Sequence, residues 1–412
     1  MIHFEKFTLD NGLTVLVNTD NSTQMVAMNI LYQVGARNEN PSRTGFAHLF
    51  EHLMFGGSIN IPSYDQPLQA AGGENNAFTN NDYTNYYLTI PSHQVETAFW
   101  LESDRMLSLA FSEKSLEVQR NVVVEEFKQR YLNQPYGDAW LKLRPLAYKV
   151  HPYRWPTIGM EIAHIEEAVL DDVKSFFQRF YIPCNAIMAL SGNISLAKAR
   201  ELSEKWFAPI PAGIKPMRDW VAEPPQLEAR REETSGHVPY PALYKAWHCC
   251  PRTDKMFHAA DLLTDVLSAG KSARLYNALV KDQQLFTDIH AYALGELDPS
   301  LIVAEGKIRE GVQVADAEKA LDEALNQITT DLISEDELER IHNKAESSNL
   351  FGETNIANRA LTLCFHEMNG DASEANNQVR LYRETTPEMI REVASQTFTV
   401  NNSSTLVYLP QK

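Results

Sequence analysis

The chain has 412 residues, a length that predicts two or more domains, each large enough to bury its own core. Hydrophobic residues make up 44% and charged residues 22%, proportions that exclude a disordered chain, a collagen and a disulfide scaffold. The formal net charge of −17 disfavours nucleic acids and anionic membrane surfaces as partners, and it favours neutral or basic ones.

Cellular location is predicted from features that the sequence lacks. The first ten residues contain no basic region followed by an apolar one, as a secretory signal would require. No run of about 18 apolar residues could span a membrane. The cysteines show no C-x-x-C spacing and are expected to be buried thiols; they are Cys184, Cys249, Cys250 and Cys364. We therefore expect a cytoplasmic protein.

The hydrophobic pattern changes repeatedly between the period of a strand and that of an amphipathic helix. In chain order it predicts a strand over 26–34, a helix over 44–55, helices over 94–109 and 113–131, a helix and a strand within 173–190, a strand over 243–249, helices over 257–268, 315–332 and 335–350, and a helix and a strand within 390–407. Because helices follow one another in pairs between strands, we expect an α+β fold with antiparallel-rich sheets covered by helices.

A proline-rich segment separates two halves of similar length. It predicts a domain over 1–207, a linker over 208–225 and a second domain over 226–412, because neither helices nor inner strands tolerate such a density of proline. The two halves also repeat the same order of elements. Residues 48–54 align with 261–267 at an offset of 213, and 173–190 align with 390–407 at an offset of 217. We interpret this as two related domains.

The most informative motif is the H-x-x-E-H sequence formed by His48, Glu51 and His52. On the predicted helix, with Thr44 as its N-cap, the two histidines lie one turn apart and project from one face. Two imidazoles placed in this way can bind one zinc ion, and the neighbouring carboxylate can take a proton from an attacking water. The alternative is a helix whose histidines are satisfied by hydrogen bonds alone.

A catalytic zinc ion usually has three protein ligands and one open position, so a third ligand is expected elsewhere. The predicted helix over 113–131 carries two candidates, Glu125 and Glu126. These side chains point about 100° apart, so only one of them can face the metal. Periodicity does not decide between them, and a solvated pair of glutamates is the alternative.

These residues resemble the pitrilysin/insulinase family of zinc peptidases, the inverzincins. The H-x-x-E-H motif is followed, 74 residues after His52, by Glu126 in Val-Val-Val-Glu-Glu-Phe. Sequence segments typical of that family occur in the same order at 10–17, 34–39, 72–79 and 180–186, and weaker similarity reaches the C-terminus. The resemblance implies zinc held by His48, His52 and Glu126, with Glu51 as general base.

The resemblance also implies a fold, a substrate and an activity. It implies two related domains of the LuxS/MPP-like metalloprotease fold, as in short bacterial or processing-peptidase-like subunits. In a dimer, four such domains would enclose a chamber in which unfolded peptides are hydrolysed by a zinc-dependent endopeptidase. An edge strand formed by Asn76, Ala77, Phe78 and Thr79 would pair with the substrate backbone.

The sequence departs from this family in its second half. Family members use an Arg and a Tyr, seven residues apart, to bind the substrate, whereas our alignment places Val280 and Thr287 there. Either the alignment slips, or a related subunit supplies the pair in a heterodimer; otherwise a homodimer is expected. The positions equivalent to the metal motif hold Asp261, Thr264 and Asp265, so this half is expected to lack a metal site.

A different class of function is the main alternative. The chain would then be a non-catalytic scaffold or assembly subunit that retains the peptidase fold. A decayed site would be expected to have lost at least one of His48, Glu51, His52 and Glu126, and all four are present.

Overall fold

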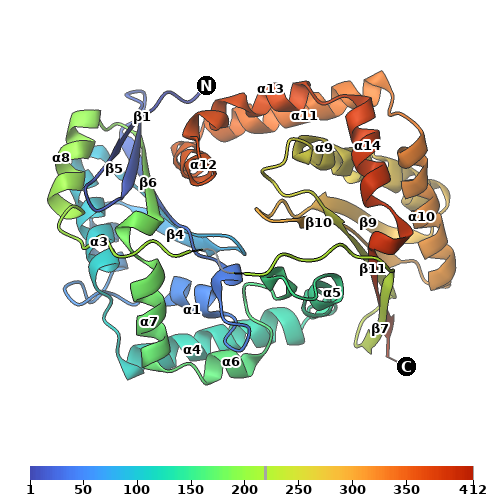
Figure 1. Cartoon of the computed structure of the whole chain (residues 1–412), viewed down its shortest axis with the longest axis horizontal. Coiled ribbons are helices and arrows are strands. Elements are labelled where there is room, and N and C mark those ends of the chain that lie inside the picture. Colours follow the sequence, from blue (N-terminus) through green and yellow to red (C-terminus); the bar gives the residue numbers. More distant parts are fainter. Residues whose placement is uncertain (218–219, 412) are drawn as a thin grey trace. The chain divides into compact units, whose positions relative to one another are not determined.

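A computed structural model describes residues 1–217 and 220–411, which form two compact units (Figure 1). Unit 1 consists of Met1–Phe127, Trp155–Trp220 and Asn349–Asn377. Unit 2 consists of Lys128–Arg154, Val221–Ser348 and Gln378–Lys412. Each unit has its own sheet and helices, so the predicted α+β class is confirmed.

Unit 1 is built on a six-stranded sheet with the strand order β1-β2-β6-β3-β5-β4. Neighbouring strands are antiparallel except for β2 and β6, which are parallel. The strands are β1 (Glu5–Thr8), β2 (Thr14–Thr19), β3 (Met25–Tyr32), β4 (Glu74–Thr79), β5 (Thr84–Pro91) and β6 (Ala186–Gly192). β6 is buried along its whole length and β3 along nearly all of it, which is expected of central strands covered on both faces.

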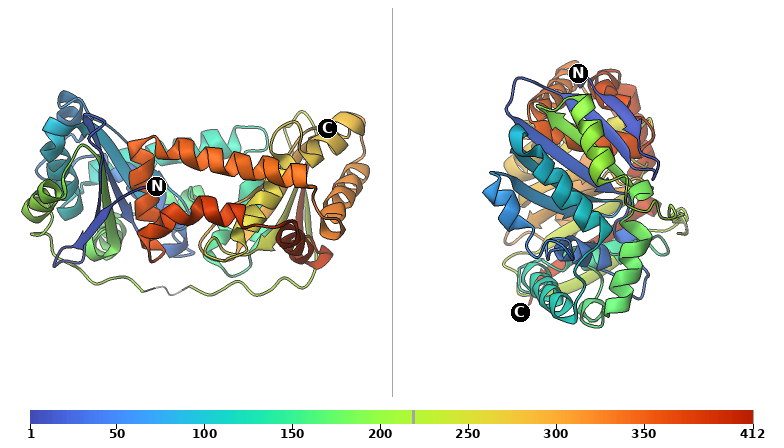
Figure 2. Two further views of the ribbon diagram at one scale, coloured as in Figure 1. Left: turned by 90° about the horizontal axis from the view of Figure 1, so that it is seen from above. Right: turned by 90° about the vertical axis from the view of Figure 1, so that its left-hand side faces the viewer.

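Helices cover this sheet and flank its β4 edge. α3 and α8 pack against each other over the sheet, as the right-hand view of Figure 2 shows. At the other end of the sheet, α1 packs against β4 and α4. The helices of unit 1 are α1 (Phe46–Leu53), α2 (Asp65–Ala70), α3 (Val95–Leu107), α4 (Glu113–Phe127), α6 (Ile162–Glu166), α7 (Leu170–Phe180), α8 (Leu196–Trp206) and α12 (Ile356–Met368).

Unit 2 is built on a five-stranded sheet with the order β7-β11-β8-β10-β9. Only β7 and β11 are parallel. The strands are β7 (Arg230–Gly236), β8 (Ala242–Cys249), β9 (Phe286–Ala293), β10 (Ser300–Ile308) and β11 (Ser403–Pro410), and the helices are α5 (Ala139–Ala147), α9 (Phe257–Ser268), α10 (Val314–Thr330), most of α11 (Glu335–Glu353), α13 (Gln378–Arg383) and α14 (Pro387–Thr397). Short π-helical turns follow α4 at Lys128–Leu132 and precede β9 at Tyr276–Asp282.

The two units repeat one topology. The order β2-β6-β3-β5-β4 in unit 1 corresponds to β7-β11-β8-β10-β9 in unit 2. The first residues of β3 and β8, of β6 and β11, and of α7 and α14 are each 217 residues apart. The prediction of two related domains is therefore confirmed, and the equivalent of the α1 helix in unit 2 is α9.

The units divide the chain differently from the predicted domains 1–207 and 226–412. Residues 128–154, which include α5, belong to unit 2, and residues 349–377, which include α12, belong to unit 1. Hydrophobic burial explains the exchange. On β10, Leu301 and Val303 pack with α5, whereas Ile302 and Ala304 face the core on the opposite side of the sheet. The proline pattern locates the connection over 208–225, of which residues 218–219 lie outside the described residues, but it does not show which helix covers which sheet.

α12 plays the corresponding part in unit 1. Its fully buried Leu363 and Cys364 pack in one cluster with Leu31 of β3 and Ile187 of β6. All four cysteines are free; Cys364 is buried as expected, and the other three are half-buried. A helix encoded near the C-terminus therefore completes the core of the N-terminal sheet.

We expect Leu363→Ala to destabilise unit 1 although the residue lies in the second half of the sequence. The cavity left beside β3 and β6 should cost about 2 to 5 kcal/mol. Amide hydrogen exchange resolved by strand measures the effect, with faster exchange expected in β3 and β6. Phe351→Ala is the control, because this side chain is 77% exposed and its loss should change the stability by less than about 0.5 kcal/mol.

Candidate metal centre

The H-x-x-E-H motif lies on α1, as predicted, and its polar residues share the face away from the core. Phe46, Ala47, Leu49, Phe50 and Leu53 form the buried face of the helix. Phe50 stacks on Phe176 of α7, with 4.9 Å between the ring centroids. This packing leaves His48, Glu51 and His52 half-buried.

The start of α1 differs from the prediction. The N-cap residue is Gly45, which has a φ of 89°, and no side chain of its own caps the helix. The expected N-cap, Thr44, is engaged elsewhere: its hydroxyl lies 2.8 Å from Nδ1 of His164 and accepts a hydrogen bond of 2.8 Å from the N–H of Met160. The prediction of Thr44 as the N-cap was therefore wrong, because the chain turns this side chain away from the helix.

α4 supplies a carboxylate to the two histidines. Leu116, Val123 and Phe127 are buried on α4, and Glu126 is half-buried beside them. Oε2 of Glu126 lies 3.6 Å from Nε2 of His48 and 3.3 Å from Nε2 of His52. Glu125 is exposed. The structure thus brings Glu126, and not Glu125, to the two imidazoles.

The donor set fits a zinc ion. His48, His52 and Glu126 form the one group of three or more such side chains in the described residues whose potential ligand atoms all lie within 4.8 Å of one another. Ligand atoms about 2.0 to 2.1 Å from a tetrahedral zinc are about 3.4 Å apart, which is close to the two measured distances from Glu126. Two nitrogens and one oxygen are also the donors typical of a catalytic zinc site.

Glu51 lies next to these ligands on the same helix. Burial raises the pKa of its carboxyl above the usual value, while Thr79 and the charge of His52 lower it. A raised pKa makes a carboxylate a better proton acceptor. This is the behaviour required of the predicted general base.

The predicted substrate strand is also an edge strand in the structure. Asn76, Ala77, Phe78 and Thr79 belong to β4, which among the described residues pairs only with β5. On this strand Oδ1 of Asn76 accepts a hydrogen bond of 2.8 Å from the N–H of Ala77. The last residue of the strand, Thr79, is the one that lowers the pKa of Glu51. Because α1 packs against β4, the proposed pairing edge lies beside the helix that carries the proposed base.

Unit 2 holds an ion pair at the positions that correspond to the metal ligands. Asp265 on α9, equivalent to His52, lies 2.5 Å from Nζ of Lys344 on α11. Lys344 is 218 residues after Glu126 and occupies the matching helix. Asp261, equivalent to His48, accepts a hydrogen bond from the hydroxyl of Tyr382. A lysine in place of the third ligand is incompatible with a zinc site of the same kind.

Comparisons with known proteins agree with this geometry. Residues 14–142 match the family described as "Insulinase (Peptidase family M16)", and residues 168–345 match the one described as "Peptidase M16 inactive domain". The chain is 30% identical over 368 residues to the zinc protease PqqE of Helicobacter pylori, covering 86% of this chain and 81% of that protein. The chain therefore belongs to the insulinase family of peptidases, M16.

Solved structures show the same fold over the whole chain. A crystal structure of a protease from Helicobacter pylori has a TM-score of 0.94 at 25% identity, and all of both chains is covered. A peptidase M16 inactive domain from Pseudomonas fluorescens has a TM-score of 0.90 at 18% identity, covering all of this chain and 98% of that one. No helix of the described residues is long and apolar enough to cross a membrane. The cytoplasmic location stays a prediction.

We expect Glu126→Gln to weaken zinc binding severely, because the neutral amide replaces a charged ligand. Mutation of groups that only orient metal ligands lowers metal affinity roughly 10- to 100-fold, and the loss of a direct ligand should lower it further. Competition with a chromogenic chelator measures the affinity. Glu125→Gln makes the same change one residue earlier on the exposed face and should leave the affinity unaltered; equal losses in both variants would argue against the assignment of Glu126.

Proposed function

We propose that the chain is a zinc-dependent endopeptidase that hydrolyses unfolded peptides. The observation that carries this proposal is the convergence of His48, His52 and Glu126, with Glu51 beside them on α1 and the β4 edge packed against that helix. A scaffold protein needs none of these groups. The relationship to a zinc protease of Helicobacter pylori supports the same conclusion.

The residues of the site have separate tasks in this mechanism. His48, His52 and Glu126 would hold the zinc ion, which when bound acts as a Lewis acid toward the scissile carbonyl and lowers the pKa of a water molecule. Glu51 accepts the proton of the attacking water and then delivers it to the leaving amine. Partial burial of Glu51 supports both transfers, since it favours the protonated form between them.

The substrate would be held by its backbone. A peptide that pairs with β4 extends the sheet, and the bonds are made to main-chain groups, so affinity depends little on its side chains. Such pairing needs an extended peptide, which favours unfolded substrates over folded ones. The net charge of −17 makes neutral or basic peptides easier to accept than acidic ones.

We expect Glu51→Gln to abolish peptide cleavage while zinc remains bound. The amide keeps the size of the side chain, but it cannot accept a proton from water. The tagged wild-type and variant chains are purified gently from the cells that produce them, together with any bound subunits. Cleavage is assayed on a pooled library of quenched fluorescent peptides, and the zinc content of each sample is measured. Glu125→Gln is the control and should cleave at the wild-type rate. A wild type without zinc and without cleavage would refute the proposal, and an active Glu51→Gln would refute the role of Glu51.

We further propose that the active species is a heterodimer with a related chain. Support comes from the alignment made above, which places Val280 and Thr287 where family members carry an Arg and a Tyr. Val280 is half-buried in the turn before β9, and Thr287 is exposed on β9. Neither side chain offers the charge or the phenolic hydroxyl needed to bind a developing oxyanion.

The zinc-loaded chain alone is therefore expected to be inactive, and activity should return when the related chain is added. Size-exclusion chromatography of the gently purified sample, with mass spectrometric identification of each component, separates the species. Full activity of the isolated homodimer would contradict the heterodimer while leaving the zinc peptidase intact.

A further inference from the structure

The loop before α1 carries a buried carboxyl group at the start of the metal-binding helix. Glu39 is only 6% exposed. Its Oε2 accepts a hydrogen bond of 2.9 Å from the N–H of Gly45, and its Oε1 accepts one of 2.8 Å from the N–H of Ala47. Both donors belong to the first turn of the helix, and Ala47 directly precedes His48.

These hydrogen bonds replace an N-cap that the sequence does not provide. The first N–H groups of an α-helix have no partner within the helix, and a side chain at the N-cap normally accepts one of them. Gly45 has no side chain, and Thr44 is turned toward His164. Glu39, six residues before Gly45, accepts these hydrogen bonds instead.

The loop that carries Glu39 is fixed in turn by contacts with the end of β4. The N–H groups of Ala36 and Arg37 donate to the carbonyl oxygens of Asn80 and Asn81, just beyond Thr79. Arg37 forms an ion pair of 2.7 Å with Asp82, and both side chains are almost fully buried. The indole N–H of Trp155 donates to the carbonyl oxygen of Ala36 at 3.0 Å. Glu39 therefore connects a rigid loop to α1.

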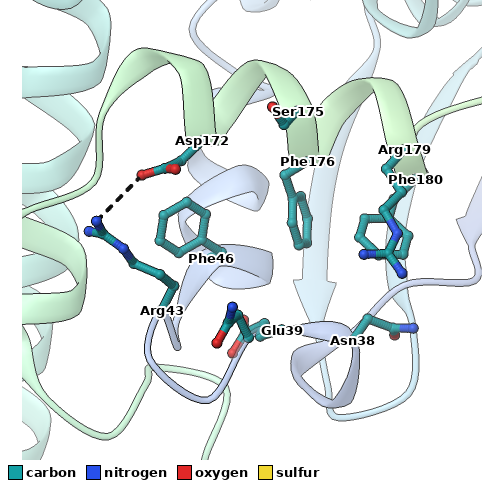
Figure 3. Close-up of a pocket in the computed structure, with 10 residues that line it drawn as sticks. Asn38, Glu39, Arg43, Phe46, Asp172, Ser175, Phe176, Arg179 and Phe180 are labelled. Carbon is teal, nitrogen blue, oxygen red and sulfur yellow. Dashed lines mark ion pairs between the residues drawn. The ribbon is translucent and has the colours of Figure 1, made fainter. Parts of the chain in front are cut away.

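A cavity lies beside the first turn of α1. Figure 3 shows Glu39 and Phe46 among the residues that line a cavity beside α7. The cavity has a volume of about 230 Å³, and Phe46 on the first helical turn is only 4% exposed beside it. Apolar packing buries this turn but cannot satisfy its N–H groups, and Glu39 supplies the acceptors for two of them.

We propose that Glu39 is a positioning residue for the metal centre. By holding the N–H groups of Gly45 and Ala47, it fixes the rotation and axial position of the first turn of α1. The direction of His48, and of His52 one turn later, follows from that position. The inference rests on the proposed zinc function, but it concerns zinc affinity and helix order, neither of which requires peptidase activity.

Glu39→Gln is the sharpest test, because it preserves the size of the side chain and replaces one accepting oxygen by an NH₂ group that faces an N–H. Burial raises the pKa of Glu39 to about 8, so an uncharged amide resembles the neutral form of this side chain in all but hydrogen bonding. We expect zinc affinity, measured by chelator competition, to fall about 10- to 100-fold. The amides of Gly45 and Ala47 should also exchange faster in the zinc-free protein.

Leu363→Ala is the matched control, because it destabilises unit 1 through α12 and leaves the residues around α1 unchanged. Its zinc affinity should stay within about twofold of the wild type. The inference is overturned if Glu39→Gln binds zinc as tightly as the wild type, or if Leu363→Ala weakens binding equally.

If Glu39→Gln does not fold, Glu39→Asp keeps the carboxylate but shortens its reach, and an unchanged affinity in that variant overturns the inference as well. A wild-type chain without zinc would instead defeat the proposed function, and the exchange rates of Gly45 and Ala47 would still test the cap.

Discussion

The approach of Glu126 to His48 and His52 is the interaction on which the rest of the site depends. The three side chains come from α1 and α4, which are separated by more than fifty residues and must pack against each other to bring the donors within 4.8 Å. The apolar residues of each helix make this possible, since Phe50 stacks on α7 and Phe127 is buried on α4. Hydrophobic burial of the two helices therefore brings the polar side chains together.

A second constraint links the base to the strand that would bind the substrate. Thr79 ends β4 and lowers the pKa of Glu51. The turn that follows it accepts hydrogen bonds from the N–H groups of Ala36 and Arg37. That loop leads to Glu39 and so to the first turn of α1. The edge strand is therefore linked to both ends of the metal-binding helix. Thr79 lies near Glu51 at one end, and the loop of Ala36 and Arg37 leads to Gly45 at the other.

Local patterns in the sequence were enough to predict the parts of the site that lie on one helix. The spacing of His48, Glu51 and His52 defined their common face, and the hydrophobic pattern over 113–131 predicted a helix that carries Glu125 and Glu126. Periodicity could not choose between these two glutamates, because the choice depends on where α4 meets α1; only the family resemblance favoured Glu126. Glu39 was missed for a similar reason, since its partners lie beyond the usual reach of a capping residue. Its position in the segment 34–39, already noted as similar to the family, was the available signal.

The exchange of helices between the two halves has a consequence for how the protein can be divided. A gene cut within the segment that encodes 208–225 would give one fragment with α5 but without the sheet it covers, and another with α12 but without β3 and β6. Each fragment would expose one apolar sheet face and one apolar helix, so that each would aggregate when made alone. Co-expressed, the same two fragments would each supply what the other lacks, and the protein would reassemble by complementation.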